Sequence, residues 1–180
     1  MELELPLTAE QVRELNVGDE IYLNGTIITA RDAAHQKLLN CGGEVPTELK
    51  QIISGGAVYH CGPLLDKQRQ DWRVLAAGPT TSMRLEGFAS DFISSYSPRV
   101  LVGKGGMGEK TAGALNKHGS VYVQFTGGAA VVAATAIQHV IDVYWLDELG
   151  MAEAVWVLAV ENFGPLIVTM DTKQKKMSNK

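Results

Sequence analysis

The sequence predicts an α/β protein with a largely parallel sheet. Three times in succession, a short extended run is followed by a glycine turn and then by a segment with helical periodicity, the pattern of β-α-β units. The chain has 180 residues, of which 46% are hydrophobic and 20% charged, so it can bury a core without staples. We expect a single domain over residues 1–171 and a disordered basic tail over 172–180.

Composition argues against several classes of protein. No apolar stretch reaches ~18 residues, and the acidic start MELELPLTAE lacks the features of a secretory signal, so we expect no membrane span and a cytoplasmic location. The net charge of −4 gives no sign of a nucleic-acid binder. Cys41 and Cys61 are too few for a disulfide framework or an iron–sulfur cluster, and no histidine pair has a metal-ligand spacing, so we expect no metal on this chain.

The first half of the chain is predicted to form short elements. Thr8 followed by Gln11 is a capping box, which predicts a helix over residues 8–16. Asn24-Gly25 between two extended runs predicts a β-hairpin over residues 19–30. Further elements are expected at 32–39 (helix), 47–53 (helix) and 57–60 (strand).

From Trp72 onward the strand–glycine–helix pattern begins. Its glycine clusters stand out, since 19 residues of the chain are glycine against a usual share of about 7%. The predicted strands are Arg73–Ala77, Arg99–Val102, Ser120–Phe125, Ala154–Val160 and Leu166–Met170, and the predicted helices are Thr81–Ser94, Glu109–His118 and Ala129–Val140.

Cations follow three of the predicted strands, namely Arg31, Arg84 and Lys104. Ligands of open α/β folds bind beyond the carboxyl ends of the strands, so these side chains converge if the strands are neighbours. Two of the junctions also begin helices, whose free N–H groups attract anions. The pocket suits a dicarboxylate or a phosphate, although Arg31 and Arg84 taken singly also fit surface salt bridges.

Hydroxyl groups gather beside these cations. Thr80, Thr81 and Ser82 precede a predicted helix, and we expect one of them to cap it. A spare hydroxyl next to the cations could act on a substrate proton, provided that the cations stabilise its alkoxide.

Asp32 and His35 form a second candidate pair, which is interpreted either as an acid–base couple or as structural donors.

The loop around Lys104, GKGGMG (103–108), includes Gly105, and its glycines let a backbone approach a ligand closely. The loop matches neither the Walker spacing nor the dinucleotide fingerprint, so a nucleotide site is weakly supported. Cys41 and Cys61 are interpreted as buried small hydrophobes.

Several of these junctions together resemble a known family. The segments are GTIITARDAAHQK (25–37), GPTTSMR (78–84), GKGGMG (103–108), VYVQFTGGAA (121–130) and AVWVLAVENFGPLIVTMD (154–171). In this order they resemble the β-type domain of iron–sulfur hydro-lyases, which include class I fumarate hydratase and L-tartrate dehydratase. The resemblance runs from about Leu5 to Asp171 and implies a swivelling β/β/α three-layer domain.

The resemblance also implies half of an active site. In that family the α part holds a [4Fe–4S] cluster through three cysteines, so this chain would bind no cofactor and would join an α subunit in a heterodimer or heterotetramer. The residues carried over by motif are Arg31, Arg84, Lys104, Thr81 and Gly105 for substrate binding, and Thr80, Asp32 and His35 for catalysis, Thr80 as the proton-transfer residue.

The implied reaction is the reversible trans addition of water to fumarate, giving (S)-malate. The cations would stabilise the aci-carboxylate that forms when the C–H proton leaves. Three alternatives stay open: the β subunit of L-tartrate dehydratase, which converts L-tartrate to oxaloacetate; a non-catalytic dicarboxylate-binding module; and a phosphate- or nucleotide-binding domain. The apolar segment 129–146 also leaves open a homodimer of the isolated chain.

Overall fold

The computed structural model describes residues 1–40, 45–69, 71–125 and 129–177. Its strands are β1 (Glu2–Glu4), β2 (Glu20–Thr29), β3 (Ala57–Tyr59), β4 (Leu64–Gln68), β5 (Asp71–Ala76), β6 (Val100–Gly103), β7 (Val121–Phe125), β8 (Ile137–Tyr144) and β9 (Val155–Met170). Its helices are α1 (Ala9–Glu14), α2 (Asp32–Asn40), α3 (Thr47–Ile53), the 3-10 turn η1 (Ser82–Leu85), α4 (Glu86–Tyr96), α5 (Glu109–His118), α6 (Ala129–Ala136) and α7 (Leu146–Leu149). Among these helices, none has the length and apolar character needed to cross a membrane.

One sheet dominates the fold, with the strand order β1-β2-β3-β6-β7-β9-β8. The first five of these strands run parallel to one another, which confirms the α/β class and the largely parallel sheet. The long strand β9 is antiparallel to β7, β8 and β2. Because β9 pairs with both β7 and β2, the pairings of β2, β3, β6, β7 and β9 close into a ring.

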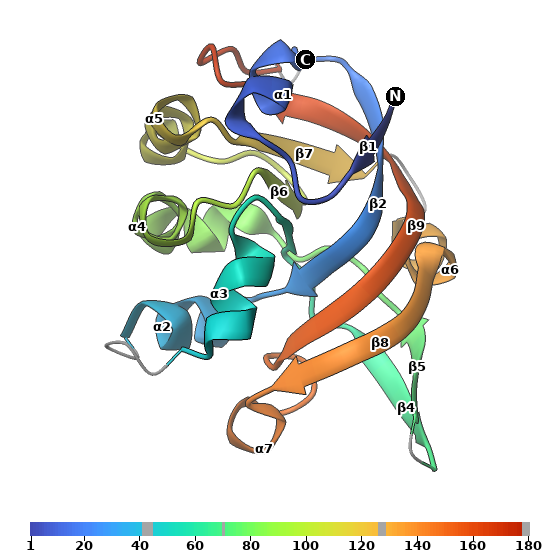
Figure 1. Cartoon of the computed structure of the whole chain (residues 1–180). Helices are drawn as coiled ribbons and strands as arrows, with labels where there is room; N and C mark the ends of the chain where they lie inside the picture. Colours follow the sequence, from blue (N-terminus) through green and yellow to red (C-terminus); the bar gives the residue numbers. More distant parts are fainter. Residues whose placement is uncertain (41–44, 70, 126–128, 178–180) are drawn as a thin grey trace.

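The two faces of the sheet belong to two different cores. Adjacent residues alternate between them, so that Ile27 packs in one apolar cluster and Ile28 in the other. Figure 1 shows α2, α3, α4 and α5 along one side of the sheet, and residues of these helices share the cluster of Ile28. The helix α6 and the β4–β5 ribbon lie on the other side (Figure 1), where their residues join the cluster of Ile27 and Trp156.

The predicted hairpin over residues 19–30 is wrong, because this segment is the single strand β2. Asn24-Gly25 lies inside the strand, where the pairing with β9 shifts register. Gly25 has a φ of +109°, and Leu5 of the preceding segment packs against it, its N–H bonded to the Asn24 carbonyl at 2.9 Å. An Asn-Gly pair therefore forms an irregularity in a long strand here, because β1, β3 and β9 pair with both of its edges.

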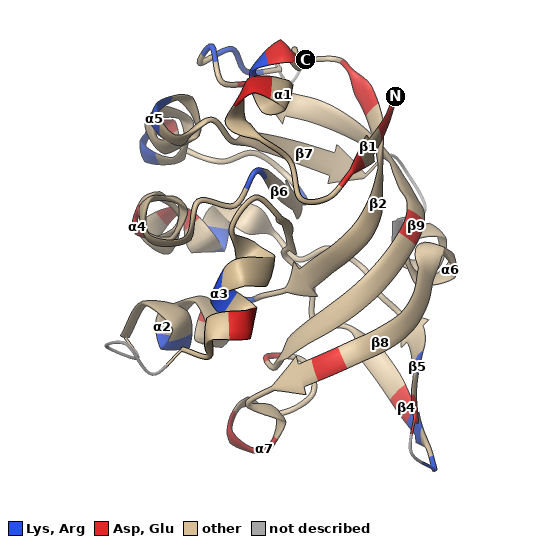
Figure 2. Cartoon of the chain, viewed as in Figure 1, with Lys and Arg blue, Asp and Glu red and all other residues tan. Residues whose placement is uncertain are grey.

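Three further predictions fail in the second half. The strand predicted at Arg73–Ala77 is β5, which pairs with β4 in a separate antiparallel ribbon instead of joining the parallel sheet. Figure 2 shows basic residues at the tip of this ribbon, where Lys67 and Arg69 are exposed. The helix predicted over Ala129–Val140 ends at Ala136, and the chain continues as β8 along the edge of β9. The two predicted closing strands are one strand, β9.

Residues 172–177 lie against the body of the protein, although the sequence predicts a disordered tail over 172–180. Met170 forms a β-bridge with Lys176, and the Met177 N–H donates to the Thr169 carbonyl at 2.9 Å. The Lys176 ammonium pairs with Glu109 at 2.5 Å. Residues 178–180 lie outside the described residues.

Candidate active site

Three strand ends meet at one edge of the sheet. Arg31 lies two residues after β2, His60 directly follows β3, and Lys104 directly follows β6. These strands are neighbours, and the His60 N–H donates to the Val102 carbonyl at 2.8 Å. The carboxyl-end geometry expected from the sequence therefore holds for Arg31 and Lys104.

Residues 78–82 lie across this edge, although the strand that leads into them is not part of the sheet. The Thr80 N–H donates to the His60 carbonyl at 2.7 Å, and the Ser82 N–H donates to the Lys104 carbonyl at 3.0 Å. The backbones of Thr80 and Ser82 are thus bonded to the ends of β3 and β6. The hydroxyl-rich segment therefore lies next to Lys104 through these backbone contacts, which the sequence did not indicate.

The Arg31 side chain is held on two sides. Its Nε lies 3.2 Å from Oε1 of Glu153, in an ion pair that leaves Nε without an aligned hydrogen-bond acceptor among the described residues. Oε2 of Glu153 accepts from the Ala33 N–H at 3.0 Å. The stem runs against Gly62, where an added Cβ would lie 2.8 Å from Cδ of Arg31. The guanidinium is therefore ion-paired with Glu153, while 26% of the Arg31 side chain is exposed.

His35 is buried below Arg31. Both its backbone N–H and its Nδ1 bond to the Arg31 carbonyl, at 2.9 and 2.8 Å. A carbonyl oxygen only accepts, so Nδ1 carries the proton of the neutral ring. The ring packs against Phe92 and His60, with centroids 4.6 and 5.5 Å away. Burial lowers the pKa of His35 to about 4, which keeps the ring neutral at pH 7.

Asp32 begins α2 between these two residues. Its Oδ1 is buried and has no hydrogen-bond partner among the described residues. Its charge favours protonation of His35, but burial outweighs it. Asp32 and His35 thus lie close together, as the sequence suggested, in an environment that holds the imidazole uncharged.

None of the three hydroxyls caps the following helix, so that prediction is wrong. Thr81 occupies the N-cap position of η1 without a capping hydrogen bond. The Ser82 side chain instead accepts from the Lys104 N–H at 3.2 Å and lies 2.9 Å from Nδ1 of His60. Thr81 is exposed and Thr80 is partly exposed, and the backbone of this segment lies against the strand ends.

Lys104, Gly105 and Arg84 are all exposed. Within the described part of the chain, neither Lys104 nor Arg84 belongs to an ion pair. Gly105 has a φ of +72°, and its carbonyl accepts from the Tyr122 hydroxyl at 2.7 Å. The loop that carries Lys104 is therefore anchored by its backbone while the ammonium faces solvent.

At the N-terminus of α5, an internal carboxylate binds some of the backbone amides that the sequence predicts to be free. The carboxylate of Glu86 accepts from the Gly108 N–H at 2.7 Å and from the Thr111 N–H at 3.3 Å. It also accepts from the Thr111 hydroxyl at 2.6 Å. An internal carboxylate therefore occupies part of this helix end, where a negative charge is favoured.

Sequence reasoning missed His60, Glu86 and Glu153. His60 is 1% exposed, and burial together with the neighbouring His35 holds its pKa well below the usual value. The signals for these residues are contacts between distant segments, which no local pattern reveals. Cys61 is buried as predicted, with a thiol pKa raised to about 12 by burial, and Cys41 lies outside the described residues.

The two buried histidines predict an acid-sensitive fold. Between pH 6.5 and about 4 the unfolded chain binds a proton at His35 that the folded chain does not, so stability is complete above pH 6.5 and falls as the pH drops. We expect the free energy of unfolding to fall by about 2 kcal/mol from pH 7 to 5 for His35 alone, measured by urea denaturation. His35→Gln should flatten this dependence, and His139→Gln, at an exposed position, should not. If the free energy of unfolding of His35→Gln still falls with pH as steeply as that of the wild type, the low pKa of His35 in the folded chain is contradicted.

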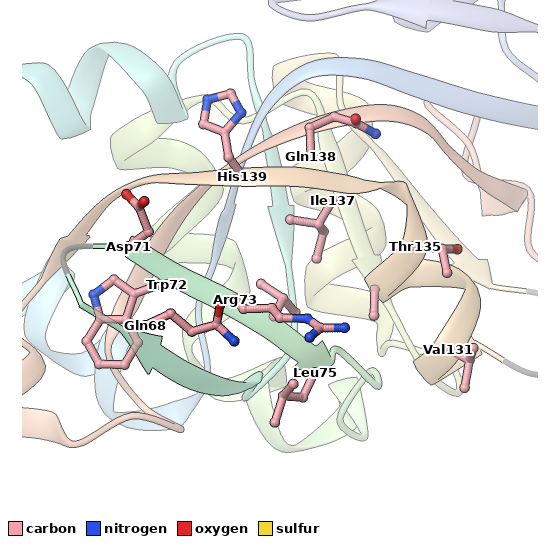
Figure 3. A pocket seen from close by; sticks show the side chains of 12 residues that line it. Gln68, Asp71, Trp72, Arg73, Leu75, Val131, Thr135, Ile137, Gln138 and His139 are labelled. Carbon is pink, nitrogen blue, oxygen red and sulfur yellow. The ribbon is translucent and has the colours of Figure 1, made fainter.

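A separate cavity of about 630 Å³ lies between β5, α6 and β8 (Figure 3). Its described lining includes Trp72, Arg73 and His139 and contains none of the predicted site residues. The strand-end site and this groove are thus distinct features of the molecule.

Comparison with known proteins places the chain in a family. A family model described as the fumarase C-terminus matches residues 1–180. The chain belongs to the fumarase C-terminus family. It is 42% identical over 170 residues to the L(+)-tartrate dehydratase subunit beta of Escherichia coli K12, covering 94% of this chain and 82% of that protein. A putative L(+)-tartrate dehydratase subunit beta of Methanocaldococcus jannaschii is 44% identical over 169 residues, which cover 92% of this chain and 85% of that protein.

A relative of a different length belongs to the same group. A putative class I fumarate hydratase of Geobacillus stearothermophilus is 45% identical over 171 residues, which cover 94% of this chain and 32% of that protein. Tartrate dehydratases and fumarate hydratases are both hydro-lyases, so the family resemblance in the sequence is confirmed.

The described residues do not fit an iron–sulfur cluster. They contain no group of three His, Cys, Asp or Glu side chains placed to hold a metal ion. The cysteine among them, Cys61, is buried with a raised thiol pKa, whereas a cluster needs several thiolates.

Proposed function

We propose that this chain is the β subunit of a two-subunit hydro-lyase that acts on a four-carbon dicarboxylate. The observation that carries the proposal is the meeting of Arg31, Lys104 and the hydroxyl-rich segment 78–82 at one sheet edge. The family and the names of its members, two of them beta subunits, support it. The chain would supply half of the site, and an α subunit would supply the cluster.

In this proposal the cations bind the substrate carboxylates. The planar fork of Arg31 or Arg84 suits a bidentate contact, and Lys104 acts as a point charge. As the C–H proton leaves, charge moves onto the adjacent carboxylate, and fixed cations stabilise that charge more than they stabilise the ground state. Thr81 and the backbone of Gly105 would complete the contacts, since both are exposed beside Lys104.

Thr80 is the proposed proton-transfer residue. Its backbone is fixed to His60, which limits the positions that its hydroxyl can take. A threonine hydroxyl acts as a base only where nearby cations lower the cost of its alkoxide, which Arg84 and Lys104 would do. Asp32 and His35 would act as supporting groups that hold Arg31, since His35 binds the Arg31 carbonyl and is neutral at pH 7.

Two substrates are candidates. Fumarate, hydrated to (S)-malate, is the first, and it suits a site that needs only two carboxylate contacts and a proton-transfer group. L-tartrate is the second, because the relatives named tartrate dehydratase subunit beta match this chain over 82% and 85% of their length.

Anaerobic co-expression with a candidate α subunit tests the proposal. Purified complex should turn over fumarate or L-tartrate, and the ratio of the two rates in parallel assays names the enzyme. Each chain purified alone is the control and should be inactive. A chain that binds malate but neither co-purifies with α nor supports turnover would favour the non-catalytic binding module instead.

A further inference from the structure

Glu153 links the turn after α7 to the segment that follows β2, at the base of the candidate site. It lies in the turn after α7, where the Glu153 and Ala154 N–H groups both donate to the Gly150 carbonyl, at 3.2 and 2.9 Å. The turn is tied to the end of β2 through Thr29, whose Oγ1 accepts from the Trp156 N–H at 3.2 Å. The backbone of Glu153 is thus fixed next to the residues that follow β2.

The Glu153 carboxylate makes two contacts with that segment. Oε1 pairs with Nε of Arg31 at 3.2 Å, and Oε2 accepts from the Ala33 N–H at 3.0 Å in the first turn of α2. The side chain of Arg31 itself cannot accept a hydrogen bond, so it cannot cap α2. Glu153 therefore caps the helix in its place, where a negative charge is favoured.

Packing restricts Arg31 further. A Cβ added at Gly62 would lie 2.9 Å from Nη1 of Arg31 and 2.7 Å from the Ala152 carbonyl, so Gly62 fits closely between the arginine and the turn of Glu153. Nε is buried and lies in the ion pair with Glu153, so the Nη groups are the donors placed to make a bidentate contact with a carboxylate.

Building on the proposed function, we propose that Glu153 is a positioning residue for substrate binding by Arg31. It holds Nε and the start of α2 in one arrangement, so that the guanidinium is directed before the substrate arrives. Such preorganisation raises the affinity for the substrate, because the cost of ordering a mobile side chain on binding is avoided.

Glu153→Gln in the assembled complex tests the inference. The amide keeps an acceptor for Ala33 but loses the charge and the second acceptor oxygen. We expect KM for the dicarboxylate to rise about tenfold to a hundredfold with a smaller change in kcat. The matched control is Glu148→Gln, since Glu148 pairs with Lys37 on the same helix α2 and is not part of the site. KM should stay at the wild-type value in this control.

A double-mutant cycle separates positioning from a merely structural role. If Glu153 acts through Arg31, then Glu153→Gln should have no further effect on KM in an Arg31→Ala background. An unchanged KM in the single variant, or an equal rise in both backgrounds, would overturn the inference. Glu153→Asp, which keeps the charge, replaces Glu153→Gln in the cycle if melting curves show that the amide unfolds the chain.

The cycle also separates this inference from the proposed function. Absence of turnover in the wild-type complex, or wild-type KM and kcat in Arg31→Ala, would contradict the proposed function and this inference with it. A damaging Arg31→Ala beside a neutral Glu153→Gln would overturn the inference alone.

Discussion

Lys104→Ala in the assembled enzyme is expected to lower kcat/KM by about a hundredfold to a thousandfold. That is the range for removing one fixed donor that stabilises developing charge. The folded chain should be unaffected, because Lys104 is exposed and makes no ion pair within the described residues. Arg84→Ala, also at an exposed position, should behave in the same way.

Steady-state kinetics on fumarate and L-tartrate, with melting curves for each variant, check this expectation. Lys110→Ala is the matched control, because Lys110 is an exposed lysine six residues further along the chain. Near wild-type turnover in both Lys104→Ala and Arg84→Ala, in folded complexes, would exclude the proposed carboxylate-binding role.

Gly103→Ala is expected to destabilise the chain by about 3 kcal/mol, at the upper end for overpacking a core. An added Cβ would lie 1.9 Å from Oγ of Ser82 and 2.8 Å from the Tyr122 hydroxyl. Ser82 cannot swing aside without losing its contacts with His60 and Lys104. The loop that carries Lys104 should move, so activity should fall together with stability.

Urea denaturation of the isolated chain measures the change. Gly106→Ala, in the same loop with nothing within 4 Å of its added Cβ, should stay within about 0.5 kcal/mol of wild type. Ser82→Gly should cost less stability in the Gly103→Ala background than in wild type, because it removes the clash. Additive effects of the two substitutions would show that the close approach of Ser82 to Gly103 is not the cause.

Local patterns were sufficient where neighbouring residues decide the structure. The capping box of Thr8 and Gln11 forms as predicted, and α5 covers Glu109–His118 as expected. Arg31 and Lys104 follow parallel strands that flank β3 on either side, so their placement at one edge could be foreseen from the α/β pattern.

Pairing between distant segments decided the rest. Asn24-Gly25 carries a hairpin signal, but β9 pairs along β2 and keeps it one strand. Residues 129–144 are apolar enough for either a helix or a strand, and the free edge of β9 turns the second half into β8. Glu153 is 122 positions from Arg31 along the chain, so its role has no local signature.

Titration of a purified, cluster-loaded α subunit with this chain tests the central claim, that the chain completes an active site. Activity should rise from near zero and saturate at one chain per α subunit. Folded Lys104→Ala chain should compete with wild type and lower the activity in proportion to its share, because it would still bind α. Full activity of α alone, or no inhibition by the variant at excess, would contradict the account.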